Sequence, residues 1–146
     1  MVGAIAGRSQ AAGRDRGQQA RQKAVADKFS FHTDRIKGKS ITLIDDSLVR
    51  GTTAHGISRS LRERGAREIH WRIASPRIIA PCHYGINTPN AANLSAANHD
   101  DAGIAEEIDA DTVTFLSMDR FQAVIAAHNV APQDCCFACM NNEYWH

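Results

Sequence analysis

The sequence predicts an α/β protein with a parallel sheet flanked by helices, and three consecutive segments carry this prediction. Residues 40–44 are apolar and rich in β-branched side chains, as a buried strand is. Residues 53–64 repeat apolar side chains at the spacing of one helical face. Residues 68–74 alternate between apolar and polar side chains, which indicates a second strand. A strand, a helix and a strand in this order form a βαβ unit, which implies parallel strands and a right-handed crossover.

The segments around this unit predict the remaining elements. Residues 13–29 are rich in Arg, Gln, Lys and Ala and predict a largely solvated helix. A turn is expected at 37–39, and Gly65 is expected to end the first core helix. Three prolines keep residues 75–90 irregular. The other expected elements are helices over 91–99 and 102–108, a strand over 112–116, and a helix over 120–127 capped by Ser117.

Composition and charge favour one globular domain. The chain has 146 residues, of which 43% are hydrophobic and 23% are charged. No apolar run approaches the roughly 18 residues that cross a bilayer, and residues 1–7 lack the features of a signal peptide, so we expect a cytoplasmic protein without a membrane partner. The net charge of +1 argues against nucleic-acid binding. Residues 1–40 carry +6 and residues 41–146 carry −5, so a basic nucleic-acid arm and a solvated helix are both open for the start of the chain.

The segment after the first strand has the composition of an anion-binding loop. Asp45 and Asp46 end the strand, and Gly51 allows close approach of the backbone to a ligand. Successive N–H groups in such a loop, and at the helix N-terminus that follows, form a concave site for a phosphate. Thr52 and Thr53 add hydroxyl groups, and the carboxylates can accept hydrogen bonds from sugar hydroxyls. The simpler alternative is that these side chains only cap a turn and the helix.

The residue order Asp-Asp-Ser-Leu-Val-Arg-Gly-Thr-Thr at 45–53 resembles the phosphoribosyl pyrophosphate signature of type I phosphoribosyltransferases. This residue order is similar to the form of the signature that is found in the amidophosphoribosyltransferase family. Further similarities follow in the same order between about residues 18 and 145. They include Gln18-x2-Arg21, Pro81-Cys82-x-Tyr84-Gly85-Ile86-x-Thr88-Pro89, Phe115-Leu116-Ser117 and Cys136-Phe137-Ala138-Cys139. The resemblance is partial, because residues 1–17 do not resemble the strands and lid that precede the signature in the family, and no stretch resembles its glutaminase domain.

The resemblance implies a ligand and a set of site residues. Phosphoribosyl pyrophosphate would be bound by Asp45, Asp46, Ser47, Leu48, Val49, Arg50, Gly51, Thr52 and Thr53. Mg²⁺ would reach Asp45 and Asp46 through the ligand. In the cluster-bearing branch of the family four cysteines hold a [4Fe–4S] cluster, and Cys82, Cys136 and Cys139 match three of them, while the upstream ligand is missing. Thiolates favour iron–sulfur clusters and zinc, so zinc and metal-free reduced cysteines are the alternatives.

Three regions and one leading function follow from this resemblance. Residues 1–17 are unmatched, residues 18–131 form a partial type I phosphoribosyltransferase domain, and residues 132–146 form a cysteine-containing tail. The expected function is that of a C-terminal fragment of an amidophosphoribosyltransferase. This enzyme forms 5-phosphoribosylamine from phosphoribosyl pyrophosphate and glutamine-derived ammonia, in the first step of de novo purine synthesis. We expect a homo-oligomer that lacks full activity alone. The alternatives are a non-catalytic module that senses phosphoribosyl pyrophosphate or another nucleotide, and a small metal-binding protein.

Overall fold

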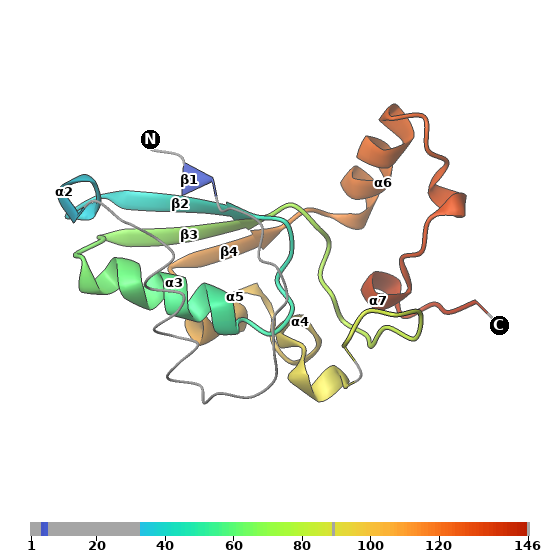
Figure 1. Ribbon diagram of the computed structural model, residues 1–146, viewed down its shortest axis with the longest axis horizontal. Helices are drawn as coiled ribbons and strands as arrows, with labels where there is room; N and C mark the ends of the chain where they lie inside the picture. The colour runs from blue at the N-terminus through green and yellow to red at the C-terminus, as the bar shows by residue number, and fades with distance from the viewer. Residues whose placement is uncertain (1–3, 6–32, 89, 146) are drawn as a thin grey trace.

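The computed structural model describes residues 4–5, 33–88 and 90–145, and it confirms the α/β class. Its centre is a parallel sheet in the order β1-β2-β3-β4, so each strand pairs with the next one along the chain (Figure 1). Three strands agree with the expected ones to within one residue, and the two-residue β1 was not expected. The strands are β1 (Ala4–Ile5), β2 (Ser40–Asp45), β3 (Glu68–Ile73) and β4 (Thr112–Phe115).

The crossover from β2 to β3 contains helix α3 (Thr52–Glu63) and forms the predicted βαβ unit. The apolar face of α3, with Ile57 and Leu61, is buried against the sheet. Gly65 follows the C-terminal cap of α3 with a φ of +83°, a left-handed conformation that glycine adopts without strain. The helix and the two strands therefore form one local unit whose geometry follows from its own sequence.

The crossover from β3 to β4 is longer and begins with an irregular stretch, as its prolines predict. The helix expected at 91–99 is divided in two, because Leu94 adopts an extended conformation and buries its side chain completely. Ile104 and Ile108 are also fully buried and anchor the second half of the crossover to the core. The elements are the 3₁₀ helix η1 (Ala91–Asn93), α4 (Ser95–Asn98) and α5 (Asp101–Glu107).

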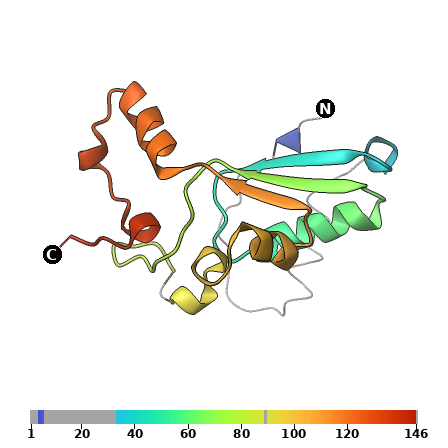
Figure 2. The same cartoon turned by 180° about the vertical axis from the view of Figure 1, so that it is seen from behind.

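Among the described residues, helices cover one face of the sheet. Helices α3 and α5 lie on the same side of the strands in both views (Figures 1 and 2). The strands accordingly bury alternate side chains: Trp71 is 2% exposed, whereas Ile44 on the opposite face is 61% exposed. Strand β2 is therefore buried on one face only, which differs from the continuous burial that its apolar sequence predicts.

The C-terminal elements lie beyond the carboxyl end of the sheet (Figure 2). Ser117 caps α6 (Met118–Ala127) as expected, because its side-chain oxygen accepts a hydrogen bond from the Arg120 N–H. A short helix α2 (Thr33–Ile36) precedes β2, and η2 (Pro132–Asp134) and α7 (Ala138–Asn141) complete the tail. The helix expected at 13–29 falls outside the described residues. In the part of the chain that the structure describes, no helix has the length and apolarity to cross a membrane.

Candidate functional site

The two adjacent carboxylates lie at the carboxyl end of β2, which is the edge of a parallel sheet where ligands usually bind. Asp45 Oδ1 accepts a hydrogen bond from the backbone N–H of Asp46 at 3.0 Å, and Asp46 Oδ1 accepts one from the Ser47 hydroxyl at 3.3 Å. Burial raises the pKa of Asp45 above its ordinary value, and the charge of Asp46 adds to this, while the Asp46 N–H opposes it. A ligand that donates hydrogen bonds to Asp45 would therefore stabilise its ionised carboxylate.

The loop from Asp46 to Gly51 leads directly into the N-terminus of α3. Gly51 has a φ of +64° and occupies the N-cap position, and no side chain caps this helix end. The first backbone N–H groups of a helix have no partner inside the helix, so this end of the 12-residue α3 presents donors and a partial positive charge. Thr52 and Thr53 are both exposed beside these donors. The arrangement suits a bound phosphate.

The residues expected to bind a ligand form one continuous segment, from the last residue of β2 through the loop to the first two residues of α3, but their side chains have different roles in it. Leu48 is buried in the core, so only its backbone can face a ligand. The Arg50 guanidinium donates through Nη2 to the backbone oxygen of Asn87 at 3.2 Å. The Thr52 hydroxyl donates back to the carbonyl of Arg50 at 3.4 Å. The Asp45 and Asp46 carboxylates and the loop backbone are therefore the groups of this segment that are placed to face a ligand.

Residues of the crossover from β3 to β4 contact this loop and the start of α3, and the sequence did not predict these contacts. The N–H of Ser95 donates to the carbonyl of Val49 at 3.0 Å, and His55 Nδ1 lies 3.0 Å from the backbone oxygen of Glu107. A Cβ added to Gly51 would lie 3.1 Å from Ile108 Cγ2 and 3.2 Å from Ser95 Oγ. No local pattern could have identified these contacts, because they join segments that are distant in the sequence.

A polar cleft of about 450 Å³ lies where the loop meets this crossover. Ser95 Oγ is buried there and is without a hydrogen-bond partner among the described residues. Two side chains of opposite charge, Arg50 and Glu107, line the cleft. Its lining consists of Arg50, Thr52, Ala92, Asn93, Leu94, Ser95, Asn98, His99 and Glu107.

The described cysteines do not form the expected ligand set. Cys82 Sγ accepts hydrogen bonds from the N–H groups of Tyr84 and Ile86, each at 3.4 Å, and these lower the pKa of its thiol. Burial, and then the charge of Cys82, raise the pKa of the Cys139 thiol. All four cysteines are free. Within residues 4–5, 33–88 and 90–145, no three His, Cys, Asp or Glu side chains gather closely enough to hold a metal ion, so the set does not fit a cluster.

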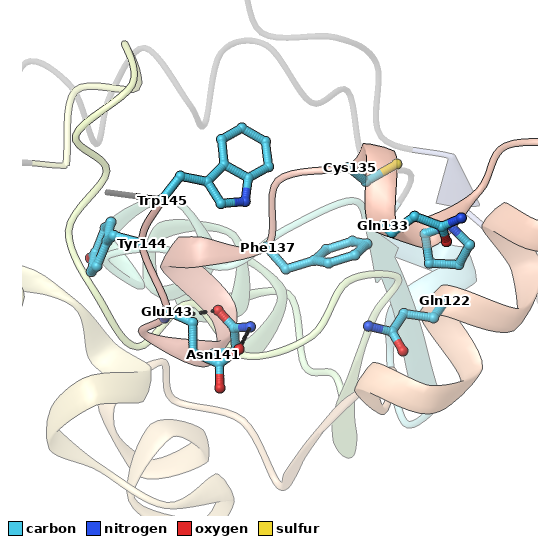
Figure 3. A pocket seen from close by; sticks show the side chains of 9 residues that line it. Gln122, Gln133, Cys135, Phe137, Asn141, Glu143, Tyr144 and Trp145 are labelled. Atoms are coloured by element: carbon cyan, nitrogen blue, oxygen red, sulfur yellow. Dashed lines mark hydrogen bonds between the residues drawn. The ribbon is translucent and has the colours of Figure 1, made fainter.

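A second hollow, of about 320 Å³, lies between α6 and the C-terminal tail (Figure 3). Aromatic and amide side chains surround it, and the Asn141 side chain donates to Glu143 at 2.9 Å. Its lining contains no Lys, Arg or His, so it does not suit a phosphate. The lining residues are Gln122, Pro132, Gln133, Cys135, Phe137, Asn141, Glu143, Tyr144 and Trp145.

Comparison with known proteins finds that the chain is similar to one kind of enzyme. No protein-family model matches it. It is 40% identical over 129 residues to the amidophosphoribosyltransferase of Bacillus subtilis, a match that covers 87% of this chain and 27% of the relative. It is 38% identical over 127 residues to the chloroplastic amidophosphoribosyltransferase 3 of Arabidopsis thaliana, covering 87% of this chain and 24% of that protein.

The fold comparison agrees with the sequence comparison. The structure of glutamine phosphoribosylpyrophosphate amidotransferase from B. subtilis, complexed with ADP and GMP, matches with a TM-score of 0.69 and 34% identity, over 90% of this chain and 29% of that one. The chain spans about a quarter of the length of the curated relatives it matches. It is therefore homologous, in sequence and in fold, to the C-terminal part of amidophosphoribosyltransferases.

Proposed function

We propose that the loop from Asp45 to Thr53 binds the ribose 5-phosphate part of phosphoribosyl pyrophosphate. One observation carries the proposal: a strand that ends in two carboxylates runs through a loop with a left-handed glycine into an uncapped helix N-terminus. The carboxylates accept hydrogen bonds from the two ribose hydroxyls. The loop amides and the first N–H groups of α3 hold the 5′-phosphate.

The reaction proposed for this site is that of an amidophosphoribosyltransferase, a pentosyl transfer. The lone pair of ammonia attacks C1 of the ribose, and the bond from C1 to the pyrophosphate oxygen breaks, so pyrophosphate leaves and the protonated amine loses one proton to solvent to give 5-phosphoribosylamine. An oxocarbenium-like transition state needs positioning and charge stabilisation more than proton transfer. Asp45 and Asp46 orient the ribose and place negative charge near the developing positive charge. The chain covers a quarter of its relatives, so we expect binding but not full turnover from it alone.

Magnesium fits the carboxylate end of the site. Carboxylate and ligand oxygens are the donors that Mg²⁺ prefers, and Asp45 and Asp46 supply two adjacent carboxylates. These residues would hold the ion through the ligand, and the ion would neutralise pyrophosphate charge. We further propose a homo-oligomer in the cytoplasm with a small-molecule substrate and with no nucleic-acid partner. The proposed site residues are Asp45, Asp46, Ser47, Leu48, Val49, Arg50, Gly51, Thr52 and Thr53, of which Leu48 and Arg50 contribute backbone groups.

Calorimetry with ribose 5-phosphate, with and without Mg²⁺, tests the proposal. We expect weak but measurable binding by the folded chain. The double variant Asp45→Asn with Asp46→Asn is expected to lose the preference for ribose 5-phosphate over inorganic phosphate and to keep some affinity for phosphate. Absence of heat at millimolar ligand, in a chain shown to be folded by circular dichroism, would refute the proposed site.

A metal-binding function is the alternative that the cysteines suggest, and the described part of the structure does not favour it. The described geometry does not assemble a third ligand with Cys82 and Cys139, and no step of the reaction depends on a cluster. Iron and zinc analysis of the purified chain decides this question. One equivalent of either metal, lost when Cys82 and Cys139 are both changed to Ser, would show that the thiols converge on a metal in solution.

A further inference from the structure

Arg50 differs from the other side chains of the loop because its hydrogen bond leaves the loop. Its guanidinium donates to the backbone oxygen of Asn87, which lies 37 residues further along the chain. The recorded side-chain hydrogen bonds of Asp45, Ser47 and Thr52 remain within residues 45–52. The Arg50 side chain therefore connects the phosphate-binding loop to another part of the molecule.

The acceptor belongs to a turn that is fixed by its own hydrogen bonds. The N–H of Cys82 lies 3.1 Å from the Thr88 hydroxyl and 3.3 Å from the Thr88 carbonyl oxygen. Thr88 is buried, and the Cys82 thiol accepts two N–H groups from inside the same turn. The backbone oxygen of Asn87 is thus held in place by its neighbour Thr88, and it can act as a fixed point for Arg50.

The C-terminal tail holds the same segment from the other end. The Tyr144 hydroxyl donates to the carbonyl of Pro81 at 2.6 Å. The backbone N–H groups of Ile79 and Ala80 donate to the carbonyl of Cys139 at 2.8 and 3.0 Å. The Tyr144 ring also packs edge-on against His83, with 4.5 Å between ring centroids. A continuous chain of contacts therefore runs from the tail through residues 79–88 to Arg50.

We propose that Arg50 is a positioning residue that links the geometry of the phosphate-binding loop to the C-terminal tail. Its backbone contributes to the anion site, whereas its guanidinium holds the loop against the Asn87 carbonyl. Loss of the tail's hydrogen bonds then increases the mobility of the loop, and removal of the Arg50 side chain breaks this connection. The identity of the ligand rests on the function proposed above, whereas the link itself is a property of the ligand-free protein.

Two substitutions and one control test the link. Arg50→Gln removes the guanidinium, and Tyr144→Phe removes the tail hydrogen bond while keeping the ring. Arg59→Gln removes the same charge from α3 at a side chain whose recorded partner is Glu63 alone, so it controls for net charge. Amide hydrogen exchange over residues 47–52 is measured without ligand. We expect faster exchange in Arg50→Gln and in Tyr144→Phe, no further increase when the two are combined, and no change in Arg59→Gln.

Calorimetry with ribose 5-phosphate gives the second measurement. We expect Arg50→Gln to raise the Kd about three- to tenfold, in keeping with the loss of one solvent-exposed hydrogen bond. If Arg50→Gln weakens binding but leaves ligand-free exchange unchanged, Arg50 contacts the ligand directly and the proposal is wrong. Additive effects of the two variants on exchange would also overturn it. If the native chain does not bind ribose 5-phosphate, the proposed function fails, and the exchange data still decide the role of Arg50.

Discussion

Asp45 is a residue at which we expect the proposed ligand binding and the stability of the fold to oppose each other. Burial raises the pKa of its carboxyl in the folded protein, so the ionised form is less favourable there than in the unfolded chain. We expect Asp45→Asn to weaken ribose 5-phosphate binding and to stabilise the ligand-free protein at neutral pH. The gain should be less than about 1 kcal/mol, because solvent screens a half-exposed carboxylate.

The effect of Asp45→Asn on the free energy of unfolding is expected to depend on pH. Below the unfolded pKa of about 4, Asp45 is protonated in both states and the substitution should have little effect on the free energy of unfolding. As the pH rises through the folded pKa, the penalty on the carboxylate appears, and the advantage of Asn grows. Urea titrations across this range measure the effect, with the exposed Asp134→Asn as control. A gain that is the same at every pH would contradict the assigned cause.

Gly51 meets two requirements at once, and Gly38 provides a matched comparison. Both have a left-handed φ, +64° and +72°, but a Cβ would meet Ile108 and Ser95 at Gly51 and nothing within 4 Å at Gly38. Gly38→Ala should therefore cost about 1 kcal/mol of unfolding free energy, from backbone strain alone. Gly51→Ala should cost about 2–4 kcal/mol, because overpacking adds to the strain. Urea titration of both variants measures the difference, and equal costs would show that the contacts behind Gly51 are absent in solution.

At the scale of the elements, a buried hydrogen bond joins α3 to β3. The indole N–H of Trp71 donates to the Ser58 hydroxyl at 2.9 Å, and both side chains are buried. Ser58→Ala leaves this N–H without a partner and should lower the free energy of unfolding by about 1–3 kcal/mol. In a Trp71→Phe background, where no N–H remains, the same change should cost much less. Equal costs of Ser58→Ala in the two backgrounds would mean that the hydrogen bond contributes nothing.

The elements that the sequence predicted well are those whose signals are local. The strand at 40–44 and the helix at 53–64 follow from side-chain periodicity, and the loop at 45–53 follows from its residue order. The division of the helix expected at 91–99 depends on the burial of Leu94, which only the folded core determines. The support of the loop by Asn87 and Ser95 likewise depends on contacts between distant segments. The placement of the loop could be predicted, but the residues that fix its geometry could not.

At the scale of the whole molecule, the direction of the crossovers decides which face of the sheet is covered. The strand order β2-β3-β4 advances in one direction, and right-handed crossovers that advance in one direction place their helices on one face. Helices α3 and α5 are both found there (Figure 1). Parallel sheets usually have cover on both faces, so a sheet with helices on one face retains an incompletely covered surface.

This surface predicts self-association of the isolated chain. Among the side chains that the structure describes, Ile44 is a large apolar one on this face, and it is 61% exposed near the end of β2. We expect light scattering to show a mass that increases with protein concentration, and Ile44→Lys to reduce that increase. The urea midpoint of the dilute variant should stay unchanged, because an exposed side chain contributes little to the fold. Ile86→Lys is the control, since Ile86 is 68% exposed in the turn at 82–88 and belongs to no strand of the sheet. A monodisperse monomer with an unfolding free energy above about 8 kcal/mol, mid-range for natural domains, would show that this face needs no cover.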